Sequence, residues 1–234
     1  MKIEIWSDFA CPFCYIGKKT FEEALNKSPN KEKFTVEFKS FQLDPSTPPY
    51  SGQNYYESMA KKFGGIERTK EMMAGVANKA KESGLTFNFE TMKPTNTLAA
   101  HRLMKLASKH NKASTLVEKI FQAHFTDSKD IGNIETLTQL AKASGLNKQD
   151  VITTLEDTSA FASDVTFDIN EASQLGITSV PSFIFNRKYL VSGAQPEAAF
   201  TQALNKLVEE HSSTPFESIN SNDKNNSRCE TDRC

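Results

Sequence analysis

The sequence is sparing in the residues that cross-link a chain or bind metal. Its 234 residues include four cysteines, four histidines and one tryptophan. The histidines show no clustered spacing, so we expect no metal site. No stretch approaches the roughly 18 apolar residues that a membrane-spanning helix needs, and no basic block is long enough to follow a phosphate backbone. We therefore expect neither membrane nor nucleic acid as a partner.

The charges of the chain are nearly balanced. There are 28 lysines and arginines against 29 acidic residues, which gives a net charge of −1. Hydrophobic residues make up 38% of the chain, enough for one sizeable core or two small ones. The first residues enter a strand pattern at once instead of a secretory signal, so we expect a cytoplasmic protein. In such a reducing compartment, a close cysteine pair favours catalysis or metal binding over a structural cross-link.

The most informative motif is Cys11-Pro12-Phe13-Cys14, which follows an apolar strand pattern and opens a helical one. Two cysteines at this spacing, where a strand gives way to a helix, indicate thiol–disulfide exchange. Proline suits the first position of a helix because its missing N–H would have no partner there. Cys11 is then the N-cap, where free backbone amides and the helix dipole favour thiolate over thiol.

These positions predict different roles for the two thiols. Cys11 is the predicted nucleophile. Cys14 lies half a turn further into the helix, where it lacks the free amides and is better shielded, yet it stays close enough to attack a mixed disulfide formed at Cys11. Cys14 is therefore the predicted resolving thiol.

The order of predicted elements is strand, helix, strand at the start of the chain and strand, strand, helix at its end. These elements cover residues 2–7, 11–26, 34–38, 182–185, 189–191 and 196–210. Between the two groups, residues 54–155 show helical periodicity. One mixed sheet interrupted by a helical insertion explains this order better than two consecutive domains do.

We therefore expect residues 1–50 and 160–211 to form one α/β domain, and residues 51–159 to form an inserted helical domain. After residue 211 the sequence is rich in Ser, Asn, Asp and Lys and has almost no apolar residues. Such a composition predicts a flexible tail over residues 212–234. The tail carries the remaining two cysteines, Cys229 and Cys234.

Three separated features together resemble the DsbA family of the thioredoxin superfamily: the cysteine motif, the helical insertion and residues 176–183, GITSVPSF. Further segments look like the FrnE-type subgroup of that family. They are Ser7-Asp8, Cys14-Tyr15-Ile16-Gly17-Lys18, Phe41-Gln42-Leu43-Asp44-Pro45, Ala100-His101-Arg102-Leu103 and Ser192-Gly193-Ala194-Gln195-Pro196. The resemblance covers about residues 1–210.

The resemblance implies a DsbA-like fold, that is, a thioredoxin fold with a helical insertion, whose active site faces a cis-proline loop. Pro181 is the matching position. The backbone of Val180 would then pair with an extended substrate, and Phe13 is the aromatic residue that we expect to be exposed beside the nucleophile. Strongly oxidising members carry histidine before the second cysteine. Phe13 offers no charge there, so we expect a more reducing protein.

The activity that this resemblance implies is dithiol–disulfide exchange without a dissociable cofactor, with oxidation, reduction and isomerisation all open as directions. The expected partners are protein or small-molecule thiols and disulfides, with glutathione or a thioredoxin-like protein as reductant. Two alternatives stay open: a glutathione-dependent isomerase or transferase of the same fold, and a chaperone or adaptor without catalysis.

Asp8, three residues before Cys11, has two open interpretations. It could accept a proton from Cys14 as the mixed disulfide resolves, or it could be a turn residue that hydrogen-bonds its own backbone. His101 could stabilise the thiolate or relay a proton, but we favour a position at the boundary between an apolar helix face and solvent. We expect His124 on the surface.

Asn96 and Thr97 precede a helical pattern and satisfy the ordinary N-cap preference. In related glutathione-dependent enzymes a helix start at this place faces the active site. We expect the capping role to account for both residues.

The tail cysteines Cys229 and Cys234 enclose four residues. We favour an auxiliary redox pair that exchanges with Cys11 and Cys14 over two exposed thiols without a role. A zinc site made of all four cysteines is a weaker alternative, since the spacing within the tail is not that of zinc knuckles.

Overall fold

The structure, a computed structural model, describes residues 1–213 of the chain. Within these residues, no helix combines the length and the apolar character needed to span a membrane. From residue 214 on, the expected tail lies outside the described residues, and so do Cys229 and Cys234.

A four-stranded sheet in the order β2-β1-β3-β4 joins the two ends of the chain. β1 (Lys2–Ser7) runs parallel to β2 (Thr35–Ser40), and β3 (Ser182–Phe185) runs antiparallel to both β1 and β4 (Tyr189–Ser192). The pairing of β1 with β3 brings together segments that are far apart in the sequence. The predicted mixed sheet is confirmed.

The remaining elements are helical. They are α1 (Pro12–Lys27), the 3-10 helix η1 (Lys31–Lys33), α2 (Tyr55–Phe63), α3 (Ile66–Glu82), α4 (Leu98–Lys109), α5 (Ala113–Phe121), the π-helical turn η2 (Gln122–Thr126), α6 (Ile134–Ala143), α7 (Lys148–Glu156), α8 (Ala162–Gln174) and α9 (Glu197–Ser213). The predicted helices end near residue 155, so α8 is not among them. The division of the chain into domains at residues 50 and 160 stays a prediction.

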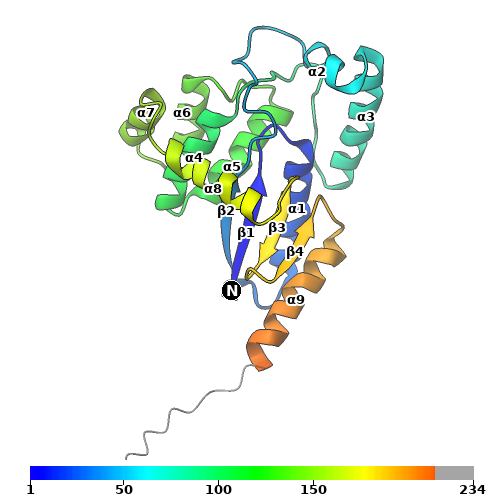
Figure 1. Cartoon of the computed structure of the whole chain (residues 1–234), viewed down its shortest axis with the longest axis vertical. Coiled ribbons are helices and arrows are strands. Elements are labelled where there is room, and N and C mark those ends of the chain that lie inside the picture. The colour runs from blue at the N-terminus through cyan, green and yellow to red at the C-terminus, as the bar shows by residue number, and fades with distance from the viewer. Residues whose placement is uncertain (214–234) are drawn as a thin grey trace, which may run out of the picture.

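The two faces of the sheet are covered by different helices, since successive side chains of a strand point to opposite faces. On one face, the ring of Phe183 lies 5.5 Å from Phe21 of α1 and 4.7 Å from Phe200 of α9. On the other face, Trp6 is completely buried in a cluster with Ala172 of α8. In Figure 1, α4 to α7 gather beside β2, whereas α2 and α3 form a pair near the start of α1.

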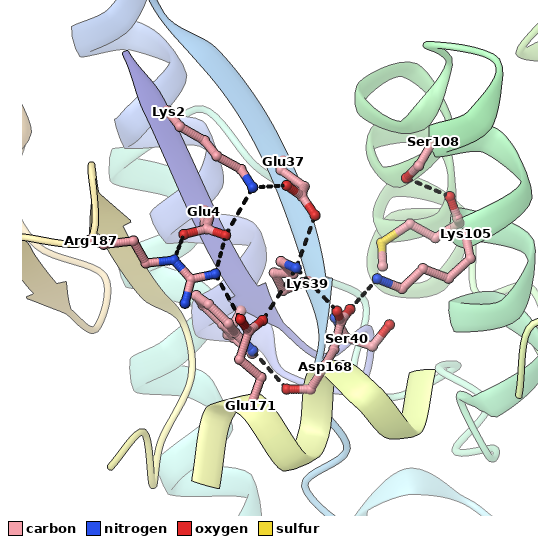
Figure 2. Close-up of polar contacts among 12 residues, drawn as sticks. Lys2, Glu4, Glu37, Lys39, Ser40, Lys105, Ser108, Asp168, Glu171 and Arg187 are labelled. Atoms are coloured by element: carbon pink, nitrogen blue, oxygen red, sulfur yellow. Dashed lines mark hydrogen bonds and ion pairs between the residues drawn. The ribbon is translucent and has the colours of Figure 1, made fainter. Parts of the chain in front are cut away.

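A buried network of charged side chains fastens α8 to the sheet (Figure 2). Asp168 of α8 is 1% exposed. Its carboxylate accepts the backbone N–H of Ser40 at 2.6 Å, pairs with Lys105 of α4 and lies 3.4 Å from Nζ of Lys39. Its backbone carbonyl accepts the indole N–H of Trp6 at 3.0 Å. One residue of α8 therefore contacts β1, β2 and α4.

The network continues along the same face of the sheet to the loop after β3. Glu4 is 1% exposed and pairs with Arg187 and with Lys2, and Arg187 also binds Glu171 of α8 at 2.8 Å. The acidic members are Glu4, Glu37, Asp168 and Glu171, and the basic members are Lys2, Lys39, Lys105 and Arg187. Equal numbers of each sign offset the cost of burying Glu4, Lys39 and Asp168, whereas the side chains of Lys2 and Arg187 are 49% and 41% exposed. The network fixes α8 and with it the loop that leads from α8 into β3.

We expect Asp168→Ala to lower the free energy of unfolding by about 3 kcal/mol, because two lysines lose a buried partner and the Ser40 N–H loses its acceptor. Urea denaturation followed through the fluorescence of Trp6 measures the change. Asp164→Ala, at an exposed position one turn earlier in the same helix, is the matched control and should cost less than about 1 kcal/mol. Equal losses in the two variants would contradict the role given to Asp168.

Candidate active site

Cys11 and Cys14 lie where β1 leads into α1. Cys11 is the N-cap of α1 and Pro12 occupies the first helical position, as the sequence indicates. Both thiols are free and buried, with 4% of Cys11 and 1% of Cys14 exposed. The Sγ atom of Cys11 lies 3.6 Å from the backbone carbonyl oxygen of Val180. The cysteine motif therefore meets the loop before β3.

That loop packs against α1 at very short range. The peptide bond between Val180 and Pro181 is cis. A Cβ atom at Gly17 of α1 would lie 3.0 Å from Cγ of Pro181 and 3.4 Å from the ring of Phe183. The helix can approach the loop this closely because residue 17 has no side chain.

The environment of Cys14 keeps its thiol protonated. Burial raises the pKa of Cys14 well above its usual value, and the hydrogen bond and charge of neighbouring Cys11 raise it further. The Ser7 side chain and the Asp8 backbone N–H lower this pKa only in part. Cys14 is therefore a thiol at neutral pH, placed to donate its S–H to Cys11.

Asp8 is a buried carboxylate that binds three different parts of the chain. It accepts hydrogen bonds from the backbone N–H of Ala10 at 3.3 Å and of Leu43 at 2.7 Å. It also accepts the hydroxyl of Thr97 at 2.8 Å, and Nε2 of His101 lies 3.3 Å away. The active-site turn, the loop after β2 and the start of α4 therefore meet at one side chain that is 1% exposed.

The pKa of Asp8 shows that its hydrogen-bond partners outweigh the effect of burial. Burial by itself would raise the pKa, but the hydrogen bond and charge of His101, the N–H of Leu43 and the hydroxyl of Thr97 together hold it below its usual value. Asp8 is therefore ionised at neutral pH although it is buried. It makes the local backbone contact that one interpretation predicted, and several contacts that neither interpretation foresaw.

Two expectations for this region are wrong. His101 is 1% exposed and contacts Asp8, so it is not a boundary residue. Thr97 is the N-cap of α4 by position but makes no capping bond, because its hydroxyl donates to Asp8. Asn96 supplies the cap instead by accepting the N–H of Leu98 at 2.9 Å. Thr97 and His101 are four residues apart and so share one helix face, which is the signal that could have linked them.

His124 is also buried, contrary to the expectation of a surface residue. It lies in the π-helical turn η2 after α5 and is 3% exposed. Burial lowers its pKa to about 4, despite the opposing influence of Asp8, so the imidazole is neutral at pH 7. Its Nδ1 atom is buried and has no hydrogen-bond partner among residues 1–213. The sequence gives no sign of the π-helical turn that places this histidine.

Of the aromatic residues near the site, only one keeps a large exposed surface. Phe13 is 39% exposed, as expected, whereas Trp6 and Phe9 are buried. A cavity of about 510 Å³ adjoins Phe13 and Cys11 and continues beneath α2 and α3. In residues 1–213, no cluster of three or more His, Cys, Asp or Glu side chains could hold a metal ion.

Comparison with known proteins identifies the family. The model of the DSBA-like thioredoxin domain matches residues 2–205. The chain belongs to the DSBA-like thioredoxin family. A solved structure described as a probable DsbA oxidoreductase, from Streptomyces coelicolor, has a TM-score of 0.85 and 35% identity over 94% of each chain. The family and the predicted thioredoxin fold with its DsbA-like helices are confirmed.

Two other relatives extend the likeness. The uncharacterized protein YwbO of Bacillus subtilis (strain 168) is 30% identical over 211 residues, which is 86% of this chain and 94% of that protein. The cytosolic disulfide reductase DsbM of Pseudomonas aeruginosa, solved with GSH, has a TM-score of 0.63 and 12% identity, over 89% of this chain and all of that one. At this identity the likeness to DsbM shows a shared fold.

Asp8→Asn tests the electrostatics of this site through the pH dependence of stability. Because the pKa of Asp8 is lower in the folded protein than in the unfolded chain, where it is about 3.9, its stabilising contribution is complete above about pH 5 and is lost as pH falls through the folded pKa. The difference in free energy of unfolding between wild type and variant should be largest at pH 6–7 and shrink towards pH 3. Urea denaturation across this range measures it. A difference that stays constant or grows on acidification would contradict the assignment.

Proposed function

We propose that this member of the DSBA-like family is a dithiol–disulfide oxidoreductase that uses Cys11 as nucleophile and Cys14 as resolving thiol. The observation that carries the proposal is the pairing of two free thiols at the N-terminus of α1, with Cys11 also against the Val180 carbonyl. The likeness to a probable DsbA oxidoreductase supports it.

The proposed reaction begins at Cys11, where the helix N-terminus and the S–H of Cys14 favour negative charge. The Cys11 thiolate attacks one sulfur of the substrate disulfide and expels the other as a thiolate. Cys14 then loses its proton and attacks Cys11, which releases the second substrate thiolate and leaves a Cys11–Cys14 disulfide. Two electrons pass from the protein to the substrate. The reverse sequence oxidises a dithiol.

Asp8 is the proposed relay for the proton that Cys14 loses. Its backbone N–H faces the sulfur of Cys14, and its ionised carboxylate contacts Nε2 of His101. The pair formed by Asp8 and His101 offers a buried acceptor and a group that can take the proton onward.

Substrates in this proposal contact three residues around Cys11. Val180 and Pro181 lie on the loop that faces the nucleophile, where the Val180 backbone is placed to pair with an extended peptide. Phe13 offers an exposed ring on the other side. Phe13 also provides no charge to stabilise the Cys11 thiolate, and we therefore propose a more reducing potential than that of strongly oxidising members.

We further propose that the protein acts in the cytoplasm, as a FrnE-type member, with glutathione or a thioredoxin-like protein as reductant. Cys229 and Cys234 serve in this scheme as an auxiliary pair that exchanges with Cys11 and Cys14. The residues of the tail lie outside the described part of the chain, and the support for their role is the pairing of all four cysteines in the sequence.

A trapping experiment separates the roles of the two active-site thiols. In a Cys229→Ser/Cys234→Ser background, so that no tail thiol can resolve the intermediate, Cys14→Ser should accumulate a mixed disulfide at Cys11 when treated with hydroxyethyl disulfide. Cys11→Ser should accumulate none and should lose at least about 100-fold in turnover. Mass spectrometry of the intact protein and its peptides identifies the adduct.

Adducts forming first at Cys14 would reverse the proposed roles. Turnover that survives Cys11→Ser would remove Cys11 as the nucleophile. A wild-type protein that turns over no disulfide would remove the oxidoreductase assignment and favour a chaperone or adaptor that needs no nucleophile.

A further inference from the structure

The cavity beside Cys11 has the dimensions of a small-molecule site. Its volume of about 510 Å³ falls within the range of roughly 300–1,000 Å³ in which proteins enclose drug-sized ligands. Cys11, which lines it, is only 4% exposed. A reactant that can enter the cavity reaches this sulfur more readily than a disulfide held on the surface of a folded protein.

One wall of the cavity is apolar and adaptable. Helices α2 and α3 supply most of it, and they form a pair near the start of α1 (Figure 1). The residues that they contribute include Met59, Phe63, Met72, Met73 and Val76. Methionine side chains are flexible and polarisable, and they adjust to ligands of different shape. Such a wall suits an aromatic or branched aliphatic group.

The buried end of the cavity is polar but offers no positive charge. Asp8 lies there as an anion, with Thr95 and Thr97 beside it, all less than 5% exposed. His124 also lines this end, and its buried Nδ1 has no partner. Its imidazole is neutral at pH 7. Because burying a carboxylate without a cation is costly, this end accepts an uncharged group, such as a hydroxyl that hydrogen-bonds to His124.

Apart from Asp8, the charged residues that line the cavity lie at its exposed rim. Lys61 and Lys62 of α2 and Asp44 after β2 are all exposed. Oxidised glutathione carries several carboxylate and ammonium groups, and the apolar wall between the rim and Cys11 gives these groups no partners. The distribution of charge therefore disfavours glutathione disulfide inside the cavity.

We propose that this cavity binds the apolar, uncharged body of a small-molecule disulfide and presents its sulfur atoms to Cys11. The inference rests on the proposed oxidoreductase function and names the substrate class of that same site. In the reaction, Cys11 bonds to one substrate sulfur as the S–S bond breaks and the other half leaves as a thiolate. Cys14 then releases the bound half as a second thiolate, and an external dithiol reduces the resulting Cys11–Cys14 disulfide.

The test compares three disulfides under excess dithiothreitol: 4,4′-dithiodipyridine as an uncharged aromatic probe, oxidised glutathione, and hydroxyethyl disulfide, which is small enough to react without filling the cavity. Each kcat/KM is divided by the rate constant of the same disulfide with dithiothreitol alone. We expect this ratio to be at least about tenfold higher for the aromatic probe than for oxidised glutathione.

Cavity-filling variants show where the preference arises. Val76→Phe and, independently, Met59→Phe should lower kcat/KM for the aromatic probe at least about fivefold while leaving hydroxyethyl disulfide within about twofold. Asn78→Phe is the matched control, because residue 78 is exposed on α3 and does not line the cavity. It should change neither substrate.

Distinct failures identify which claim is wrong. If hydroxyethyl disulfide is not reduced either, the proposed oxidoreductase function fails. If hydroxyethyl disulfide is reduced but the aromatic probe gains no preference and the filling variants have no effect, the cavity inference alone is overturned. If a mixed disulfide on a hydrophobic peptide is preferred to the aromatic probe and the filling variants abolish that preference, a protein side chain occupies the cavity and the small-molecule class is wrong.

Discussion

The active site depends on a carboxylate held in its ionised form inside the protein. Asp8 stands between β1 and Cys11, and its hydrogen bonds with the N–H groups of Ala10 and Leu43, the hydroxyl of Thr97 and the imidazole of His101 stabilise the charge against burial. An unpaired anion at this position would cost several kcal/mol. The same bonds that stabilise the charge join the cysteine turn, the loop after β2 and the start of α4. The cysteine motif is therefore positioned by α4, which lies between β2 and β3 in the chain, as well as by the sheet.

The opposite side of the site depends on a second set of buried charges. Asp168 and its partners hold α8 against β1 and β2, and α8 leads directly into the loop that carries Val180 and Pro181. On the other face of the sheet, Gly17 allows α1 to meet Pro181. Cys11 thus lies between the start of α1 and the loop before β3, and separate contacts hold these two segments in place. Its sulfur lies 3.6 Å from the carbonyl oxygen of Val180. Such preorganisation is what an exchange reaction between closely spaced sulfur atoms requires.

Local patterns in the sequence predict the sheet and the helix start well. The apolar pattern of β1, the proline after Cys11 and the strand pair near the end of the chain each depend on neighbouring residues, and each is found in the structure. Contacts between distant segments are harder to predict. Thr97 and His101 have ordinary local explanations and acquire their role only when folding brings Asp8 to them from 89 and 93 residues away. The buried position of His124 depends on a π-helical turn, and the position of α8 depends on charges that three other elements supply. The neighbouring sequence indicates neither feature. The cavity is likewise formed by side chains from separate helices and loops.

The central claim is that Cys11 and Cys14 form a reversible redox pair, and a redox titration tests it most directly. The protein is equilibrated in a series of glutathione buffers, free thiols are trapped by alkylation, and each cysteine is mapped by mass spectrometry in wild type and in Cys229→Ser/Cys234→Ser. We expect both proteins to form a Cys11–Cys14 disulfide whose population follows the buffer potential as a two-electron couple. If the tail pair exchanges with this disulfide, the midpoint of the titration shifts in the variant. A pair that stays reduced, or that is never found linked at any buffer potential, would contradict the account.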